Sequence, residues 1–433
     1  MPDATAITMT ASPDTMQAND TTTQTGHGTG YPRVCLLIGS YYPIVGGGES
    51  HARLLSSAMN AAGANVFVLT QHRLAQTPRF ERFEGVDVYR IGLNNFKRLG
   101  KYLMMPGACW KLLTLRKRYD SIYVCGHRTL GVVGVLMGKL LGKRVVLRSE
   151  SCTELSGDYA LSGKAGVARA LVKAIIAMRN TVLKRTDRFL AISRVIHEEF
   201  VGQGVSESKI VQITNGVDMN RFQPAPPEQR DRLREQFGWS DQRVLIYTGK
   251  LNRGKGLELL LRSWKTIAPE YEDAHLVLVG GGANQHLSCE QRLLDFVAEH
   301  ALGDRVTFTG NVSNVSEYLQ AADLFVFPSE SEALGLSLVE AMACGLPAVA
   351  TAVGGILDVI DDERVGLLFP VDDEPAFTAQ VRRLLDDPSR AAGLAKAGQA
   401  SVTRRFGMAG IAQQHIELFN ELSPALAKSG AGV

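Results

Sequence analysis

The sequence predicts an α/β protein built from two doubly wound domains. Short apolar runs that can form buried strands alternate with segments of helical spacing. Many of these runs end in glycine-rich turns, which is where strands of doubly wound sheets bind ligands. The pattern begins at Tyr31, stops at a proline-rich stretch near the middle of the chain, and then restarts. With 433 residues, the chain is long enough for two domains that each bury a core.

Four segments follow from this pattern. Residues 1–30 contain no Lys or Arg and no apolar core, which argues against a signal peptide and favours a disordered tail. Residues 31–222 form the first predicted domain and residues 223–407 the second. The linker at the start of the second domain, Gln223–Gln229, contains three prolines. Residues 408–433 are predicted to form a last helix and a tail.

Composition narrows the class of protein. Hydrophobic residues make up 45% of the chain and charged residues 21%, which is ordinary for a globular protein. The chain has no uncharged apolar run of the roughly 18 residues that a transmembrane helix needs. Its 6 cysteines include no Cys-x-x-Cys pair, which favours reduced, buried thiols in a cytoplasmic protein over disulfides or a metal site.

The net charge of +3 conceals an asymmetry between the two halves of the chain. Residues 1–222 hold 28 basic and 16 acidic residues, whereas residues 223–433 hold 19 basic and 28 acidic residues. A basic half suggests an anionic partner, such as a membrane surface, a phosphorylated acceptor or nucleic acid. Nucleic acid is disfavoured because no recognised binding motif accompanies the charge.

The first strand and the first helix enclose a candidate ligand loop. The strand Val34–Ile38 ends in the turn Tyr41–Glu49, which contains Gly46 and Gly47, and a helix from about Ser50 to Ala61 follows. Such a turn is a ligand site in doubly wound domains. It lacks the Gly-x-Gly-x-x-Gly pattern, so a dinucleotide is not favoured. The glycines could also serve only to make a tight turn.

A histidine follows another strand of the first domain. The strand Ser121–Val124 ends in the segment Cys125–Arg128, so His127 lies at a carboxyl end, on the ligand edge of the sheet. A structural histidine is the alternative. The remaining strands predicted for this domain are Val66–Leu69, Val145–Leu147, Arg188–Ser193 and Ile210–Ile213.

Two segments of the first domain, Lys97–Arg118 and Ser162–Arg188, are basic and amphipathic. Cationic residues beside an apolar helical stripe can bind an anionic membrane interface, which would place a cytoplasmic protein on the inner face of a membrane. Helices that cover a sheet and have solvated outer faces are the alternative. In the second segment, the apolar face consists of Ala168, Leu171, Ile175, Met178 and Val182.

The second domain opens with a cationic loop. The strand Arg243–Tyr247 is followed by the glycine-rich loop Thr248–Gly256 and a helix from about Leu257. Lys250 and Lys255 in this loop can donate charge-assisted hydrogen bonds to a diphosphate. They could equally be solvated lysines of a turn. Further strands are predicted at Leu276–Val279 and Val306–Thr309.

The densest pattern in the chain runs from Pro328 to Gly355. A strand at Leu324–Phe327 precedes it, and a helix at Gly335–Ala343 and a strand at Ala348–Thr351 lie within it. Glu332 lies in the loop before the helix, and Glu340 lies inside the helix, about two turns from its start.

This arrangement predicts a phosphate and sugar site. The helix N-terminus carries unpaired N–H groups and partial positive charge, which together bind anions. Gly335 lets the backbone approach a ligand, and Glu332 and Glu340 can accept hydrogen bonds from sugar hydroxyls on either side of the phosphate. Alternatively, Glu332 is only an N-terminal helix charge and Glu340 a solvated surface residue.

Together these motifs resemble the retaining glycosyltransferases of family four, and the resemblance covers residues 31 to about 420. It implies the GT-B fold, with two facing Rossmann-like domains, a deep cleft between them and a last helix that crosses back to the first domain. The most specific motif contains Glu332 and Glu340 within Pro-Ser-x-x-Glu and Glu-Ala-Met-Ala-Cys-Gly-Leu-Pro. Supporting motifs are Gly46-Gly47-x-Glu49, Asn215-Gly216-Val217-Asp218, and Gly249-Lys250 with Lys255-Gly256.

The resemblance implies a role for each matched position. Lys255 would hold the diphosphate, and Lys250 stands where the family usually has an arginine. Glu332 would lie near the donor sugar, Glu340 at the nucleotide ribose and His127 near the reacting sugar. The donor-binding residues implied in this way are Gly46, Gly47, Lys250, Lys255, Asn311, Val312, Leu334, Gly335, Leu336, Ser337 and Glu340, and the catalytic residues are Glu332, His127 and Lys255.

The implied activity is transfer of a sugar from a nucleotide-diphosphate sugar to a hydroxyl acceptor with retained anomeric configuration. A lipid-linked saccharide in polysaccharide or cell-envelope synthesis is the expected acceptor. No Asp-x-Asp lies near the site, so leaving-group stabilisation without a metal or another cofactor is the hypothesis. A nucleotide-sugar epimerase of the same fold and a non-catalytic nucleotide-sugar-binding protein are the alternatives.

Overall fold

A computed structural model describes residues 31–44, 46–92, 100–127, 129–161, 165–283 and 287–423. These residues all belong to the unit Tyr31–Val433. Several parts of the predictions lie outside the described residues. They are the tail at residues 1–30, the end of the chain from residue 424, and the basic residues Lys97, Arg98 and Lys164.

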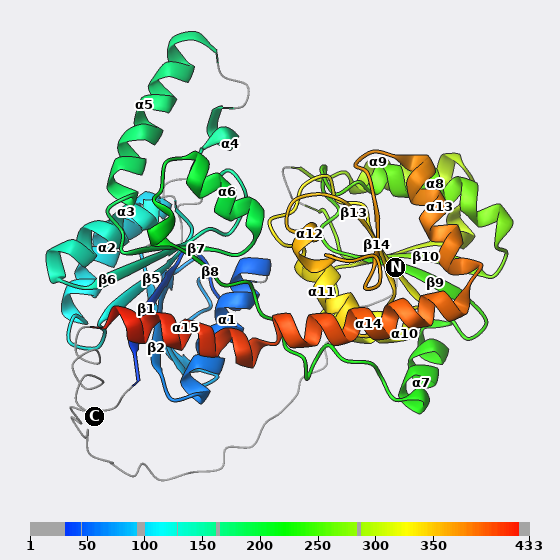
Figure 1. The fold of residues 1–433 in the computed structure, drawn as a ribbon, viewed down its shortest axis with the longest axis horizontal. Helices are drawn as coiled ribbons and strands as arrows, with labels where there is room; N and C mark the ends of the chain where they lie inside the picture. The colour runs from blue at the N-terminus through cyan, green and yellow to red at the C-terminus, as the bar shows by residue number, and fades with distance from the viewer. Residues whose placement is uncertain are drawn as a thin grey trace. The chain divides into compact units, whose positions relative to one another are not determined.

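The first sheet has eight strands in the order β3-β4-β2-β1-β5-β6-β7-β8 (Figure 1). All neighbouring strands are parallel except β3, which pairs antiparallel with β4. The central strands are apolar throughout because helices cover both faces of a parallel sheet. The strands are β1 Arg33–Ile38, β2 Asn65–Gln71, β3 Phe80–Phe83, β4 Val86–Ile91, β5 Ser121–Cys125, β6 Arg144–Arg148, β7 Arg188–Ala191 and β8 Ile210–Gln212.

Helices connect these strands. The helix α5 extends beyond its neighbours in Figure 1 and buries only Asn180 and Leu183. The helices of this part are α1 Gly47–Ala61, α2 Gly100–Thr114, α3 Thr129–Leu141, α4 Asp158–Leu161, α5 Gly166–Leu183, α6 Arg194–Gly202 and the 3₁₀ turn Glu207–Lys209.

The second sheet has six parallel strands in the order β11-β10-β9-β12-β13-β14. They are β9 Arg243–Thr248, β10 Ala274–Val279, β11 Val306–Gly310, β12 Leu324–Phe327, β13 Ala348–Thr351 and β14 Leu367–Phe369. The helices are α7 Pro227–Phe237, α8 Leu257–Ile267, α9 Glu290–Glu299, α10 Val315–Ala321, α11 Leu336–Ala343, α12 Ile356–Val359, α13 Glu374–Leu385 and α14 Pro388–Phe406, with 3₁₀ turns at Ala268–Glu270 and Gly303–Arg305.

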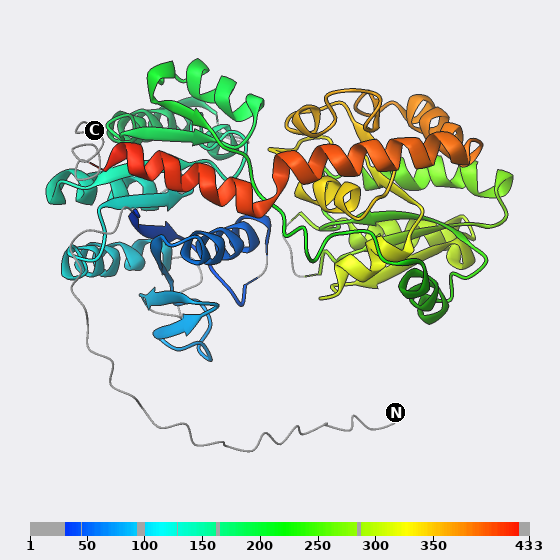
Figure 2. The same cartoon turned by 60° about the horizontal axis from the view of Figure 1, so that its bottom comes forward.

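The last helix, α15 Met408–Leu422, returns to the first sheet. It follows α14 after one residue, packs against α1, and can be followed in Figure 2 as the continuation of α14. Its inner face is buried, and His415 Nε2 accepts a hydrogen bond from the Tyr123 hydroxyl at 3.1 Å. The predicted crossover helix and the fold class are therefore confirmed.

The two places where the chain passes between the sheets are bonded to each other. The N–H group of Val217 donates to the carbonyl of Phe406 at 2.8 Å, and the N–H group of Met408 donates to the carbonyl of Val217 at 3.1 Å. Val217 and Gly407 thereby form an isolated parallel bridge. The predicted domain limits at residues 222 and 407 stay predictions.

Most predicted strands agree with the structure to within one or two residues at each end, but some elements differ. The helix α1 begins at Gly47, three residues before the predicted start, so Gly47 and Gly48 belong to its first turn. The hairpin β3–β4 and the short strand β14 were not predicted. All 6 cysteines are free thiols, and 4 of them are buried.

Buried histidines make the stability of this fold depend on pH. Burial lowers the pKa of His415 to about 4, whereas an unfolded histidine titrates near 6.5. The unfolded chain therefore binds more protons in this window, and stability falls as the pH drops below about 6.5. We expect His415 alone to cost about 2 kcal/mol of unfolding free energy between pH 8 and pH 5.

Urea denaturation at both pH values measures this loss. In the variant His415→Gln, whose side chain does not titrate, the unfolding free energy should vary less with pH. An equal pH dependence in both proteins would contradict the assignment.

Candidate active site

The N-terminus of α11 forms one side of the candidate site. Gly335 precedes the helix with φ +92°, in the left-handed region, and a Cβ atom there would lie 3.2 Å from the Phe327 ring. Glycine is therefore needed to start the helix at Leu336. No side chain caps this end, so its first N–H groups remain available to an anion. Leu334, Leu336 and Ser337 lie at this helix start, as predicted.

The same helix start corrects one prediction. Because α11 begins at Leu336, Glu340 is its fifth residue and lies one turn, rather than two, from the start. Burial raises the pKa of Glu340 to about 7, and the nearby Arg221 only partly offsets this effect. The carboxyl group therefore changes its charge near neutral pH.

Lys255 and Glu332 form an ion pair. Lys255 Nζ lies 2.5 Å from Glu332 Oε1, and the Ser329 hydroxyl donates to the same oxygen at 2.8 Å. The loops that carry them are in contact, because a Cβ atom on Gly256 would lie 1.9 Å from the Pro328 carbonyl oxygen. The loops after β9 and β12 thus place a cation and a carboxylate together at the carboxyl ends of adjacent strands.

The other predicted residues of the second sheet lie at the same edge. Lys250 is exposed in the loop after β9. Asn311 and Val312 follow β11, and the Asn311 side chain lies beside Gly281, where a Cβ atom would be 3.1 Å from its Nδ2. This edge therefore holds all the donor-binding residues predicted for the second domain.

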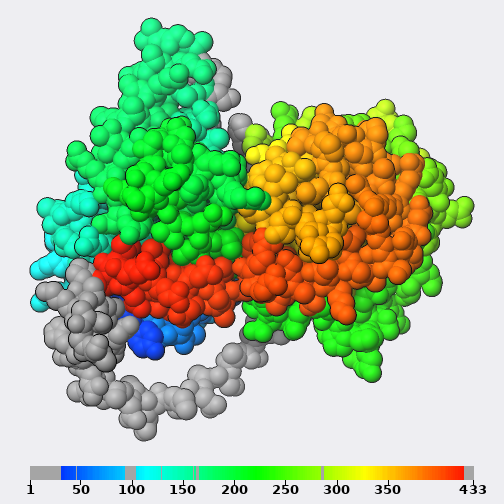
Figure 3. All heavy atoms as spheres, viewed as in Figure 1, coloured from blue at the N-terminus to red at the C-terminus, as the bar shows by residue number. Residues whose placement is uncertain are grey.

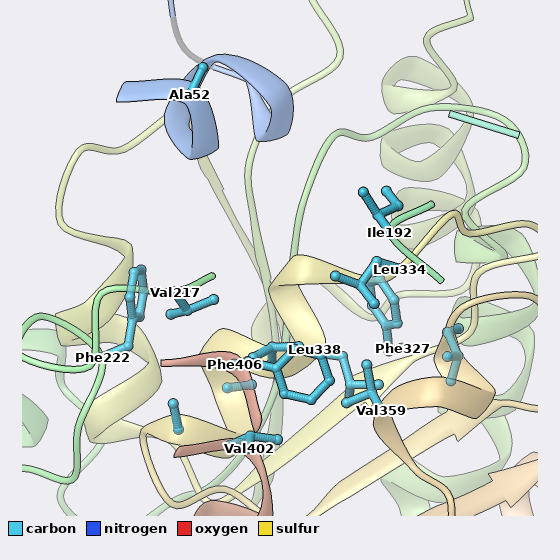
Figure 4. Close-up of a cluster of buried hydrophobic side chains, with 14 of the residues drawn as sticks. Ala52, Ile192, Val217, Phe222, Phe327, Leu334, Leu338, Val359, Val402 and Phe406 are labelled. Carbon is cyan, nitrogen blue, oxygen red and sulfur yellow. The ribbon is translucent and has the colours of Figure 1, made fainter. Parts of the chain in front are cut away.

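The N-terminus of α1 meets the N-terminus of α11. A Cβ atom on Gly47 would lie 3.7 Å from Leu336 Cδ1, and Gly46 precedes α1 in an extended conformation. The uncapped N-terminus of α11 contributes partial positive charge beside the loop of the Lys255–Glu332 pair, which suits a phosphate group, whereas at the start of α1 the Glu49 carboxylate lies against Gly46. The loop before α11 is anchored in the hydrophobic core. Figure 4 shows part of this core, which includes Leu334, Phe327 and Ile192.

His127 is placed differently from the other predicted residues. Its side chain is fully buried, and its ring packs against Phe189 and Phe200 at centroid distances of 5.8 and 5.4 Å. Burial lowers its pKa to about 3, so the imidazole is neutral. In this conformation the imidazole ring packs in the hydrophobic core, and the predicted position of His127 near the reacting sugar stays a prediction.

Sequence reasoning missed two polar contacts between residues that are far apart in the chain. Arg194, which opens α6, donates from its backbone N–H and its Nε to the carboxylate of Asp358 in α12, at 2.8 and 2.5 Å. Arg148, at the end of β6, is 1% exposed and donates to Asn215 Oδ1 at 2.6 Å. The sequence shows Arg148 only as the end of a strand, which does not indicate that its side chain is buried.

Comparisons with known proteins agree with this geometry. The family described as "Glycosyltransferase Family 4" matches residues 45–221, and "Glycosyl transferases group 1" matches residues 229–401. The chain is 30% identical to D-inositol 3-phosphate glycosyltransferase of Kineococcus radiotolerans over 86% of this chain and 90% of that protein. It belongs to glycosyltransferase family four. It is accordingly a glycosyltransferase with the GT-B fold.

Other similar proteins share parts of this likeness. The mannosyltransferase LpsB of lipopolysaccharide core biosynthesis from Rhizobium meliloti is 31% identical over 45% of this chain and 56% of its own length. The structure of sucrose-phosphate synthase from Thermosynechococcus elongatus matches with TM-score 0.74 and 26% identity, covering 91% of this chain and all of that one. HepE of Anabaena, solved with UDP-glucose, matches in fold with TM-score 0.71 and 22% identity over 90% of this chain and 99% of its own.

The ion pair gives a first test of the site. We expect Lys255→Ala to lower kcat about 100-fold or more, because it removes a cation from the developing negative charge of the leaving group. Lys265→Ala, which removes an exposed lysine of α8, is the matched control and should keep wild-type kinetics. Wild-type turnover in the Lys255 variant would remove this residue from the catalytic site.

Proposed function

We propose that the chain is a retaining glycosyltransferase that moves a sugar from a nucleotide-diphosphate sugar to a hydroxyl group of a lipid-linked saccharide in polysaccharide or cell-envelope synthesis. The observation that carries the donor class is the uncapped N-terminus of α11 next to the loop in which Glu332 pairs with Lys255. LpsB, which is named for lipopolysaccharide core biosynthesis, supports the acceptor class.

The Lys255–Glu332 pair suggests how the donor binds. A diphosphate that approaches Lys255 competes with Glu332 for the ammonium group, so donor binding would release the carboxylate. Glu332 could then accept hydrogen bonds from the donor sugar. Since a lysine and helix N–H groups supply the positive charge, we propose that the leaving group departs without a metal ion or another cofactor.

Retention of configuration is part of the proposal. Once the donor has displaced it from Lys255, Glu332 serves in this proposal as a hydrogen-bond acceptor for the donor sugar and not as the nucleophile. We therefore favour a front-face reaction, in which the acceptor hydroxyl attacks on the side from which the diphosphate leaves and gives its proton to the leaving phosphate. Anomer analysis of the product decides between retention and inversion.

A thermal-shift screen identifies the donor. UDP-glucose, GDP-mannose, ADP-glucose and dTDP-glucose are compared, because a ligand of the native state raises the melting temperature by mass action. The affinity for this donor should also depend on pH. We expect it to fall as the pH drops through about 7, because Glu340 becomes protonated there and its carboxyl group accepts hydrogen bonds from the ribose hydroxyls less well.

The variant Glu340→Gln should bind the donor more weakly at pH 8 and show little dependence on pH. Equal pH dependence in both proteins would contradict the ribose role of Glu340. Donor binding without any transfer to water or to saccharide acceptors would favour the alternative of a non-catalytic binding protein.

We further propose that the first domain rests on an anionic membrane surface. Along α5, Val167, Leu171, Ile175 and Met178 recur at helical spacing and are 86, 61, 52 and 68% exposed. Arg169 and Lys173 are exposed on the same helix, which contains no acidic residue. A helix that combines an exposed apolar stripe with basic residues and no acidic ones suits an anionic interface.

Neighbouring helices add to this surface. Exposed apolar side chains also lie on α2, at Trp110 and Leu113, and on α3, at Leu136 and Leu140. The helix α2 packs against α3, and α3 packs against α5, which stands at the upper left of Figure 3. Among the described residues, no helix has both the length and the apolar content to cross a bilayer.

Liposome flotation tests the membrane proposal. The wild-type protein should float with vesicles that contain phosphatidylglycerol and remain unbound with pure phosphatidylcholine. Arg169→Glu combined with Lys173→Glu should weaken binding at least about tenfold, because each basic residue near the surface contributes roughly 1 kcal/mol. Lys396→Glu, an exposed position of α14, is the control. Unchanged flotation of the double variant would count against the proposal.

A further inference from the structure

The loop Ser149–Gly157, between β6 and α4, is held by hydrogen bonds to two carboxylates, the half-buried Glu199 and the buried Glu154. The side chain of Glu199 in α6 accepts hydrogen bonds from the backbone N–H groups of Thr153, Leu155 and Ser156 at 2.8, 2.9 and 3.1 Å. A single carboxylate that binds three peptide groups makes this loop part of the rigid frame, since charge-assisted hydrogen bonds are among the stronger ones.

The same loop is tied to two further elements. Glu154 accepts from the backbone N–H of His127 at 3.0 Å and from the Ser151 hydroxyl at 3.1 Å. Arg179 and Asn180 of α5 both donate to the carbonyl oxygen of Leu155 at 2.8 Å. The loop therefore connects the turn after β5 with the helix that carries the exposed apolar stripe.

Backbone strain marks the middle of this loop. Thr153 has φ +65°, a left-handed conformation that a β-branched residue adopts only at a cost of about 1–3 kcal/mol. Strain of this kind persists where surrounding bonds fix the backbone, and here Glu199 holds the N–H group of the strained residue. Such residues are concentrated at ligand-binding sites.

The loop faces the donor site. The thiol of Cys152 lies 3.9 Å from the backbone carbonyl oxygen of Glu332. Glu150 reaches the start of α1, where its Oε1 would lie 2.9 Å from a Cβ atom on Gly48, and its Oε2 would lie 3.6 Å from a Cβ atom on Gly126. Its side chain is 34% exposed. The Glu150 carboxylate thus lies beside Gly48, which directly follows the two glycines predicted to approach the donor.

A buried cation lies behind Glu150. The guanidinium group of Arg148 is buried, and its Nη1 lies 3.9 Å from Glu150 Oε1. Within the described residues, Nη1 and Nε of Arg148 have no hydrogen-bond partner. Arg148 thus places a buried positive charge within ion-pair distance of the Glu150 carboxylate. An ionised carboxylate only accepts hydrogen bonds, so it suits hydroxyl groups.

We propose that Ser149–Gly157 is an acceptor-binding loop in which the Glu150 carboxylate accepts a hydrogen bond from a hydroxyl group of a saccharide acceptor. The proposal rests on the glycosyltransferase function proposed above and adds the position of the acceptor. The loop is bonded to α5 through Leu155 and approaches Glu332 through Cys152, so it links the helix proposed to contact the membrane with the donor site.

Steady-state kinetics of Glu150→Gln test this position. The donor is the nucleotide-sugar found in the thermal-shift screen, and the acceptors are octyl glycosides of glucose, galactose and mannose. We expect the acceptor KM to rise about tenfold or more, since the variant loses a charge-assisted hydrogen bond. The donor dissociation constant and the rate of donor hydrolysis by water should change less than about twofold. Glu207→Gln, an exposed position of the same domain, is the control.

A second variant separates this role from a structural one. Thr153→Gly relieves the strained φ, so its melting temperature should not fall, but the loosened loop should raise the acceptor KM several-fold. The proposal is overturned if donor binding or hydrolysis falls in parallel with transfer in Glu150→Gln, or if the acceptor KM is unchanged in both variants. Absence of donor turnover by the wild-type protein would instead contradict the proposed function.

Discussion

The ion pair between Lys255 and Glu332 is the interaction on which the architecture of the site depends. It joins the loops after two adjacent strands, and their backbones approach so closely that Gly256 has no room for a side chain against Pro328. Both groups are partly buried, so each needs the other as a counter-charge while no ligand is bound. A diphosphate can replace the Glu332 carboxylate as the partner of Lys255, so the ammonium group of Lys255 keeps a counter-charge. The site can therefore exchange the ion pair between Lys255 and Glu332 for one between Lys255 and a phosphate group.

The sequence predicted the parallel strands well because buried strands are continuous apolar runs that end in glycine. It failed where position depends on backbone geometry or on distant packing. The number of helical turns between the start of α11 and Glu340 depends on where the helix begins, and the positive φ of Gly335 determines that position. The environment of His127 depends on Phe189 and Phe200, which lie more than 60 residues further along the chain.

Two features of the structure were not predicted from the sequence, for different reasons. The hairpin β3–β4 left a signal in the Glu84-Gly85 turn, where both residues have positive φ, and in the alternation of Val86–Ile91. The burial of Arg148 left none, because a charged residue at the end of a strand is normally assigned to the surface. The donor half of the candidate site was thus predictable from motifs, whereas the loop Ser149–Gly157 required the structure.

The paired backbone at Val217 and Gly407 has a mechanical consequence. The chain passes between the two sheets twice, and these two passages are hydrogen-bonded to each other rather than separate. Two independent linkers would let the domains slide or twist freely, but a bonded pair allows mainly rotation about one short axis. For a given angle of rotation, contacts between the domains then move further the more distant they are from this axis. We expect the two domains to open and close by a hinge rotation about the two backbone hydrogen bonds that join Val217 to Phe406 and Met408.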